Sequence, residues 1–164
     1  MKRRPPGIRQ KRRKLLIDTN ILLLYIVGSL SPNQIARHKR TKTFTVEDYW
    51  LLDSQLAKFG DIVVTPNVLT EVSNLLGYTD DRTRQELLSW LKSRVSSFDE
   101  RFVPSHEAVE AVEFSRLGLT DATILSCPTH DLTVLTDDLH LYLALQKRGI
   151  EVINFNHLRE GSWP

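Results

Sequence analysis

Short apolar runs alternate along the chain with longer segments in which apolar residues recur at helical spacing. Runs of this length, bounded by charged and turn residues, are typical of buried strands. They predict strands at 15–17, 62–64, 133–135 and 151–153. The helical spacing predicts helices over about 20–29, 46–59, 66–76, 80–95 and 105–116, from 120 onward, and from 138 to about 147. The polar stretch 29–45 predicts a loop or a short, exposed basic segment.

This alternation predicts a parallel α/β sheet with helices on both faces, because a strand buried on both faces is apolar throughout. The chain has 164 residues, a length typical of one globular domain, and it contains no internal repeat. We expect a basic, disordered arm at 1–14, one domain at 15–157 and a C-terminal tail at 158–164.

The single cysteine, Cys127, excludes an internal disulfide, and no nearby Cys or His indicates a zinc site. We therefore expect a reducing, cytoplasmic setting. The apolar run 21–28 after a basic start resembles a secretion signal, but Asp18 and Asn20 interrupt it and no small-residue cleavage site follows. The run is also far shorter than the roughly 20 residues that span a bilayer. We expect a buried strand and helix here, and no membrane partner.

Charge is distributed unevenly, although the net charge is only +2. Eight of the 22 Lys and Arg residues lie in residues 1–14, which contain no acid, and the rest of the chain carries the other 14 together with all 20 acidic residues. Basic arms of this kind commonly bind nucleic acid. Two alternatives stay open, a solvated tail and an arm that docks on its own acidic body.

Acidic residues stand at three places where a predicted strand or loop gives way to a helix: Asp18, Asp121 and the pair Asp137 and Asp138. Ligands of open α/β sheets bind at the carboxyl ends of the strands. Each of these acids can also serve only as a helix cap, because an anion at a helix N-terminus is favourable.

A further acid, Glu71, lies beside Val68 and Leu75 on the apolar side of its predicted helix. Burying an unpaired carboxylate is costly, so we expect the side chain to point inward or to the rim of the sheet. An Arg partner from elsewhere in the chain, or a rotation into water, is the alternative.

Converging carboxylates repel, at about 4 kcal/mol per pair for a separation of ~4 Å and an effective dielectric constant near 20. Protons or cations must neutralise such a cluster, and carboxylate oxygens suit Mg²⁺ or Mn²⁺. One or two such ions lower the pKa of a bound water and neutralise charge on a phosphate. If the fold brings the acids together, they indicate phosphodiester hydrolysis.

Four segments resemble, in the same order, the motifs of the PIN-domain nucleases, a family that includes VapC-type toxins. They are 15–20, which reads Leu-Leu-Ile-Asp-Thr-Asn, and 65–72, 117–122 and 134–138. The resemblance spans about residues 15–155. It implies a three-layer α/β/α sandwich with a mostly parallel sheet of about four or five strands. It also implies a ribonuclease that uses Mg²⁺ or Mn²⁺ and a metal-activated water to hydrolyse RNA.

The resemblance assigns roles residue by residue. The expected metal ligands and catalytic residues are Asp18, Glu71, Asp121 and Asp138. Asp137 is a possible further ligand, although the Thr-x-Asp spacing favours Asp138. Asn20 and Thr136 would orient the carboxylates. RNA, an antitoxin protein and a second copy of the chain are the implied partners, and a PIN-like module that binds RNA or protein without cleavage is the alternative.

Basic residues elsewhere are candidates for RNA contacts, because Lys and Arg neutralise phosphates. The candidates are Arg12, Arg13, Lys14, Arg37, His38, Lys39, Arg40 and His140. A solvated loop around 37–40, and a solvated helical position for His140, explain these residues equally well.

Overall fold

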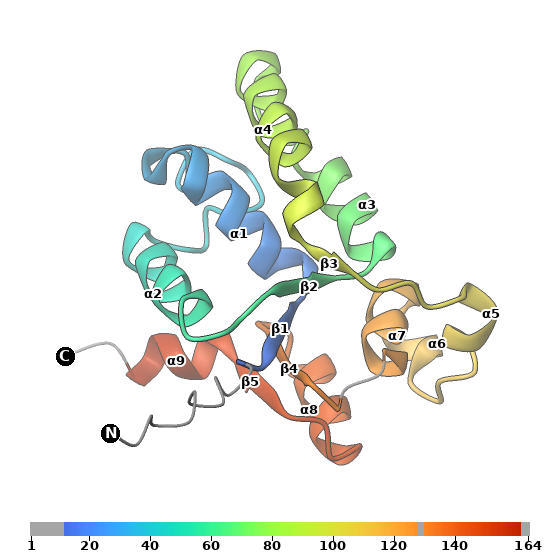
Figure 1. Ribbon diagram of the computed structural model, residues 1–164. Helices are drawn as coiled ribbons and strands as arrows, with labels where there is room; N and C mark the ends of the chain where they lie inside the picture. The colour runs from blue at the N-terminus through green and yellow to red at the C-terminus, as the bar shows by residue number, and fades with distance from the viewer. Residues whose placement is uncertain (1–11, 128–129, 162–164) are drawn as a thin grey trace, which may run out of the picture.

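Figure 1 shows the computed structural model of the chain, which describes residues 12–127 and 130–161. At its centre lies a sheet of five parallel strands in the order β3-β2-β1-β4-β5. The strands are β1 (Lys14–Ile17), β2 (Ile62–Val64), β3 (Asp99–Glu100), β4 (Leu132–Thr136) and β5 (Val152–Asn154). The predicted α/β class and the predicted strand number are confirmed, and the sheet is parallel throughout.

Helices cover both faces of this sheet. In the described residues they are α1 (Thr19–Leu30), α2 (Val46–Leu56), α3 (Pro66–Leu75), α4 (Asp81–Arg94), α5 (Ser105–Ala108), α6 (Phe114–Leu117), α7 (Leu119–Ser126), α8 (Leu139–Lys147) and α9 (Phe155–Gly161). Two short 3-10 helices are η1 (Pro32–Gln34) and η2 (Val95–Ser97). Helices α2, α3 and α4 pack around α1 on one side of the sheet, and α5 to α8 pack on the other (Figure 1). The predicted three-layer arrangement is therefore confirmed.

Strand β1 occupies the middle of the sheet. Leu16 pairs with Val63 of β2 on one side and with Val134 of β4 on the other. All three side chains are fully buried, which explains why these strands are apolar on both faces. Because the strands are parallel, the residues that follow β1, β2 and β4 emerge at one edge of the sheet.

The apolar run 21–28 lies within α1 and is part of the core, as predicted. Ile21, Leu22 and Leu24 have no exposed surface. Gly28 lets α1 approach α2, because a Cβ at this position would overlap the ring of Tyr49. No helix in the described part of the chain is both long and apolar enough to cross a bilayer.

The structure differs from the predicted local structure at three places. The helix over 105–116 is divided into α5 and α6, because its apolar positions make no buried stripe: Val112 is 86% exposed. Strand β3 was not predicted, since its residues Asp99 and Glu100 are polar and it pairs only with β2 at the edge of the sheet. Residues 158–161 belong to α9 rather than to a tail, and α9 is anchored by the buried ring of Phe155.

The described end of the basic arm docks on the body of the protein. Arg13 forms an ion pair with Glu151 at 3.1 Å, and Lys14 forms ion pairs with Asp99 at 2.7 Å and Asp61 at 3.4 Å. These contacts lie where the strands begin, at the edge opposite the carboxyl ends. The ion pairs of Lys14 indicate that this residue docks on the protein rather than on RNA. RNA contact by Arg12 and Arg13 stays a prediction. The predicted disorder of residues 1–11 lies outside the described residues.

Candidate functional site

Asp18 follows β1 directly and is the most deeply buried of the predicted acids, with 5% of its surface exposed. It caps α1, since its Oδ1 accepts a hydrogen bond of 3.1 Å from the backbone N–H of Ile21. Its Oδ2 accepts from the hydroxyl of Thr136 and, at 3.3 Å, from the backbone N–H of Asp137. Asp18 is therefore a helix cap, but capping accounts for only one of its two carboxylate oxygens. The other oxygen, Oδ2, is held by Thr136 at the end of β4 and by the backbone of Asp137. Thr136 therefore lies beside the Asp18 carboxylate, and its role in orienting a metal ligand stays a prediction.

Asp137 and Asp138 follow β4 and play different structural parts. Asp138 is exposed and caps α8, because its Oδ1 accepts from the backbone N–H of Leu141 at 2.8 Å. Asp137 is less exposed, and its two carboxylate oxygens lie 3.2 and 3.4 Å from the side-chain nitrogen of Asn20. Asn20 therefore orients Asp137, and Asp137 is the neighbour that lies beside Asp18.

Glu71 lies in the middle of α3, a helix that begins with the cap Thr65 and with Pro66 in its first turn. Its side chain is exposed at the rim of the sheet, and its Oε2 accepts from the hydroxyl of Thr19 at 3.1 Å. Glu71 therefore lies at the rim of the sheet with access to water. No Arg or Lys among the described residues forms an ion pair with it.

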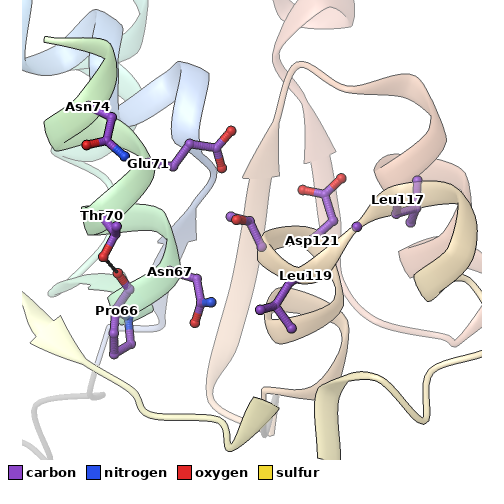
Figure 2. A pocket seen from close by; sticks show the side chains of 10 residues that line it. Pro66, Asn67, Thr70, Glu71, Asn74, Leu117, Leu119 and Asp121 are labelled. Atoms are coloured by element: carbon purple, nitrogen blue, oxygen red, sulfur yellow. Dashed lines mark hydrogen bonds between the residues drawn. The ribbon is translucent and has the colours of Figure 1, made fainter. Parts of the chain in front are cut away.

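Asp121 lies in the first turn of α7, which begins after Gly118 with φ of +84°. Figure 2 shows Glu71 and Asp121 facing each other across an open cavity between α3 and α7. The cavity has a volume of about 540 Å³. It is lined by Pro66, Asn67, Thr70, Glu71, Asn74, Leu117, Gly118, Leu119, Thr120 and Asp121.

We call Asp18, Glu71, Asp121, Asp137 and Asp138 the acidic cluster. Burial and mutual repulsion raise the pKa values of three of its members, Asp18, Asp121 and Asp137. Burial, with the charges of Asp137 and Asp121, raises the pKa of Asp18 to about 8 against the hydrogen bonds that stabilise its anion. Burial and the charges of Asp138, Glu71 and Asp137 raise the pKa of Asp121 to about 7. Burial also raises the pKa of Asp137. The five residues therefore share one electrostatic environment.

Within the described residues the acidic cluster is not ion-paired, although the charge of Arg159 opposes the rise in the pKa of Asp137. Among the described residues, no Lys, Arg or His forms an ion pair with any of its five members. Carboxylate oxygens are the ligands that Mg²⁺ and Mn²⁺ prefer, so the donor set fits a hard divalent cation. Within the same residues, no three Asp, Glu, His or Cys side chains are already grouped closely enough to hold a metal ion. Glu71 and Asp121 line the open cavity, and the described acids do not converge on one point.

A chain of polar contacts that the sequence did not reveal supports the turn at Asp137. The side-chain amide of Asn156 donates to the Asp137 carbonyl at 2.9 Å, and Arg159 donates to the Asn156 side-chain oxygen at 3.1 Å. Arg159 also donates to buried Asp48 at 2.9 Å. Asp48 in turn forms the capping box of α2 with Thr45. The turn of the acidic cluster is thereby tied to α9 and α2.

The basic candidates divide into exposed and buried residues. Arg37, Lys39 and Arg40 are exposed, and so is His140 near the start of α8, so their contacts with RNA stay predictions. His38 has no exposed surface, so the predicted RNA contact is wrong for this residue. Its Nδ1 accepts from the backbone N–H of Arg40 at 3.3 Å, and burial lowers its pKa. A buried, neutral imidazole cannot neutralise a phosphate.

Comparisons with known proteins identify a structural likeness but no family. No protein-family model and no curated protein sequence matches the chain. Among solved structures, the chain is similar to a domain of a functionally unknown protein from Methanocaldococcus jannaschii DSM 2661, with 16% identity and a TM-score of 0.46 over 87% of this chain and 90% of that chain. A likeness at this level carries no information about function.

Proposed function

We propose that the protein is a metal-dependent ribonuclease, with the acidic cluster as its active site. The observation that carries the proposal is the cluster itself: five carboxylates come from four separate segments, and none of them forms an ion pair within the described residues. The pKa values of Asp18, Asp121 and Asp137 are raised. A structure that only needed helix caps would not bring their charges together, and strongly perturbed acids are typical of functional sites. The resemblance to PIN-domain nucleases supports the same reaction.

Mg²⁺ or Mn²⁺ held by these carboxylates would lower the pKa of a water molecule and neutralise charge that develops on the phosphate. The contribution of the protein is to orient the ligands before RNA arrives. Thr136 and the N–H groups of Ile21 and Asp137 hold the Asp18 carboxylate. Asn20 holds Asp137, and Thr19 holds Glu71. Such outer contacts commonly change metal affinity or activity by about 10- to 100-fold.

Asp121 is the member of the cluster that is free to move a proton. Its carboxylate makes no hydrogen bond with the described residues and lines the open cavity opposite Glu71 (Figure 2). We assign it as the base that takes a proton from the attacking water. The water oxygen bonds to phosphorus, the bond from phosphorus to the ribose leaving oxygen breaks, and solvent protonates that oxygen.

The proposal includes a protein partner, either a second copy of the chain or an antitoxin-like protein. Three apolar side chains on the α6–α8 side are strongly exposed: Val112 at 86%, Leu139 at 53% and Leu143 at 50%. Val112 and Leu143 line a second cavity of about 440 Å³ together with Arg116 and Lys147. Exposed apolar patches of this kind mark contact surfaces. A cytoplasmic setting stays a prediction.

The direct test is cleavage of a labelled single-stranded RNA by the wild-type protein in Mn²⁺. We expect cleavage that EDTA abolishes and that Asp121→Asn lowers by at least about 100-fold, the usual contribution of a positioned base. Asp53→Asn, an exposed acid on α2, is the matched control and should keep full activity. Full activity of Asp121→Asn would overturn the assignment, and absence of cleavage by the wild type would leave only the alternative of a binding module.

A further inference from the structure

The cavity beside the acidic cluster has two unlike walls. One wall is α3, which presents Asn67, Thr70 and Asn74 along the side that carries Glu71 (Figure 2). The opposite wall is the segment around Gly118, with the side chains of Leu117 and Leu119 (Figure 2). The same wall also carries Thr120 and Asp121, so the cavity combines the apolar surface of two leucines with polar groups on both sides, as ligand pockets do.

The amides of Asn67 and Asn74 are uncommitted, unlike the other amides near the cluster. Asn20 and Asn156 are bound to Asp137, and the Asn154 side chain accepts from the backbone of Asn156. Asn67 and Asn74 make no side-chain hydrogen bond with the described residues. Thr70 is different again, because its hydroxyl donates to the Pro66 carbonyl at 2.9 Å. The two amides are thus the free hydrogen-bonding groups of the α3 wall.

The composition of the cavity indicates which part of a nucleic acid it receives. No Lys or Arg is among the residues that line it, so it lacks the cations that bind phosphates in nucleic-acid grooves. An amide offers both a donor and an acceptor, which matches the edge of a base, and apolar side chains pack against the base face. Asn74 follows Asn67 by seven positions, which corresponds to about 10 Å along a helix at 1.5 Å per residue.

We propose that this cavity selects the RNA sequence: unpaired bases next to the cleaved phosphate enter it, and Asn67 and Asn74 read their edges. The choice of RNA as ligand rests on the proposed function. Adenine is the favoured base, because the side-chain amide of Asn matches its adjacent donor and acceptor in a bidentate pair. Glu71 lies between the two amides in sequence, so the bases that are read flank the reacting group.

The test measures binding rather than cleavage, by fluorescence anisotropy in Mn²⁺ with labelled eight-nucleotide oligoadenylate and oligouridylate. Asp18→Asn serves as the parent, so that the RNA stays intact. We expect the parent to prefer oligoadenylate, and the added changes Asn67→Ala and Asn74→Ala each to weaken oligoadenylate binding by about 5- to 150-fold, the range for loss of a bidentate contact. Asn33→Ala, an exposed Asn in η1, is the matched control and should change nothing.

Equal binding of the two oligonucleotides, no binding of either, or unchanged preference in both Asn variants would overturn the inference. Cleavage by the otherwise wild-type protein is measured in parallel on the same RNA. Cleavage without a role for Asn67 or Asn74 would leave the ribonuclease and remove the base selection. Selective binding without cleavage would leave the base selection and remove the ribonuclease.

Discussion

Replacing Asp18 by Asn removes a buried carboxyl group that can titrate, while keeping the shape of the side chain. In the unfolded chain this carboxyl loses its proton near its ordinary pKa of 3.8, whereas in the folded protein its pKa is raised to about 8. Between these values the folded protein binds more protons than the unfolded chain, so the free energy of unfolding falls as the pH rises. Asn carries no charge at any pH and does not incur this cost.

The size of the effect follows from the same shift. At pH 7, the raised pKa of about 8 lowers the free energy of unfolding by about 4 kcal/mol. This figure follows from roughly 1.4 kcal/mol for each pH unit above the ordinary pKa of 3.8. An Asn side chain has only one oxygen that can accept hydrogen bonds. In the wild type, one Asp18 oxygen accepts from Ile21 and the other accepts from Thr136 and Asp137, so the amide cannot satisfy both sides. The mismatch loses about 1–3 kcal/mol. We therefore expect Asp18→Asn to be less stable than the wild type near pH 4 and more stable by about 1–3 kcal/mol near pH 7.

Thermal unfolding in EDTA from pH 4 to pH 8 measures this difference. A gain of that size raises the melting temperature by roughly 2–12 °C for a chain of this length. Asp53→Asn is the control and should follow the wild type at every pH, because Asp53 is exposed. A difference between Asp18→Asn and the wild type that does not change between pH 5 and pH 8 would refute the reasoning, because the fold would then not raise the pKa of Asp18.

Three further predictions concern the fold, the support of the site and association. Gly28→Ala should lower the free energy of unfolding by about 1–3 kcal/mol in denaturant titrations, because its Cβ overlaps Tyr49; an unchanged midpoint would contradict the close contact. Asn156→Ala should lower RNA cleavage by about 10-fold with little change in melting temperature, because it releases the Asp137 carbonyl; equal loss of activity and fold would mean a structural role only. Leu143→Asp should abolish any self-association seen in sedimentation, and an unchanged oligomer would place that contact elsewhere.

The predictable part of the fold is the part with a local physical signal. Apolar runs predict β1 and β2 because a buried strand must be apolar whatever its neighbours are. Polar Asp99 and Glu100 form β3 only because Val63 and Val64 lie beside them, and no local pattern records that neighbour. The apolar residues of 105–116 predict one continuous helix, but Val112 is exposed in the structure. An apolar residue does not have to be buried, so its position in the sequence does not show on which side it lies.

The candidate site divides in the same way. Asp18 and Asp138 carry a local signal, because an acid after a strand and before a helix is recognisable from its neighbours, and the helical spacing around Glu71 is equally local. The contact between Arg159 and Asp48 spans 111 residues and depends on where α9 lands, so the sequence alone does not indicate it. His38 looked like part of a basic surface because its neighbours are basic, but the folded turn buries it.

The chemistry at the cut ends of RNA tests the central claim most directly. Wild-type protein and Asp18→Asn are incubated with a mixed RNA pool, with and without Mn²⁺, and the termini of the products are identified. Attack by water predicts Mn²⁺-dependent products with ordinary phosphate and hydroxyl ends, and none from Asp18→Asn. Products ending in 2′,3′-cyclic phosphate would identify the ribose hydroxyl as the nucleophile, and these or undiminished cleavage by Asp18→Asn would contradict the account.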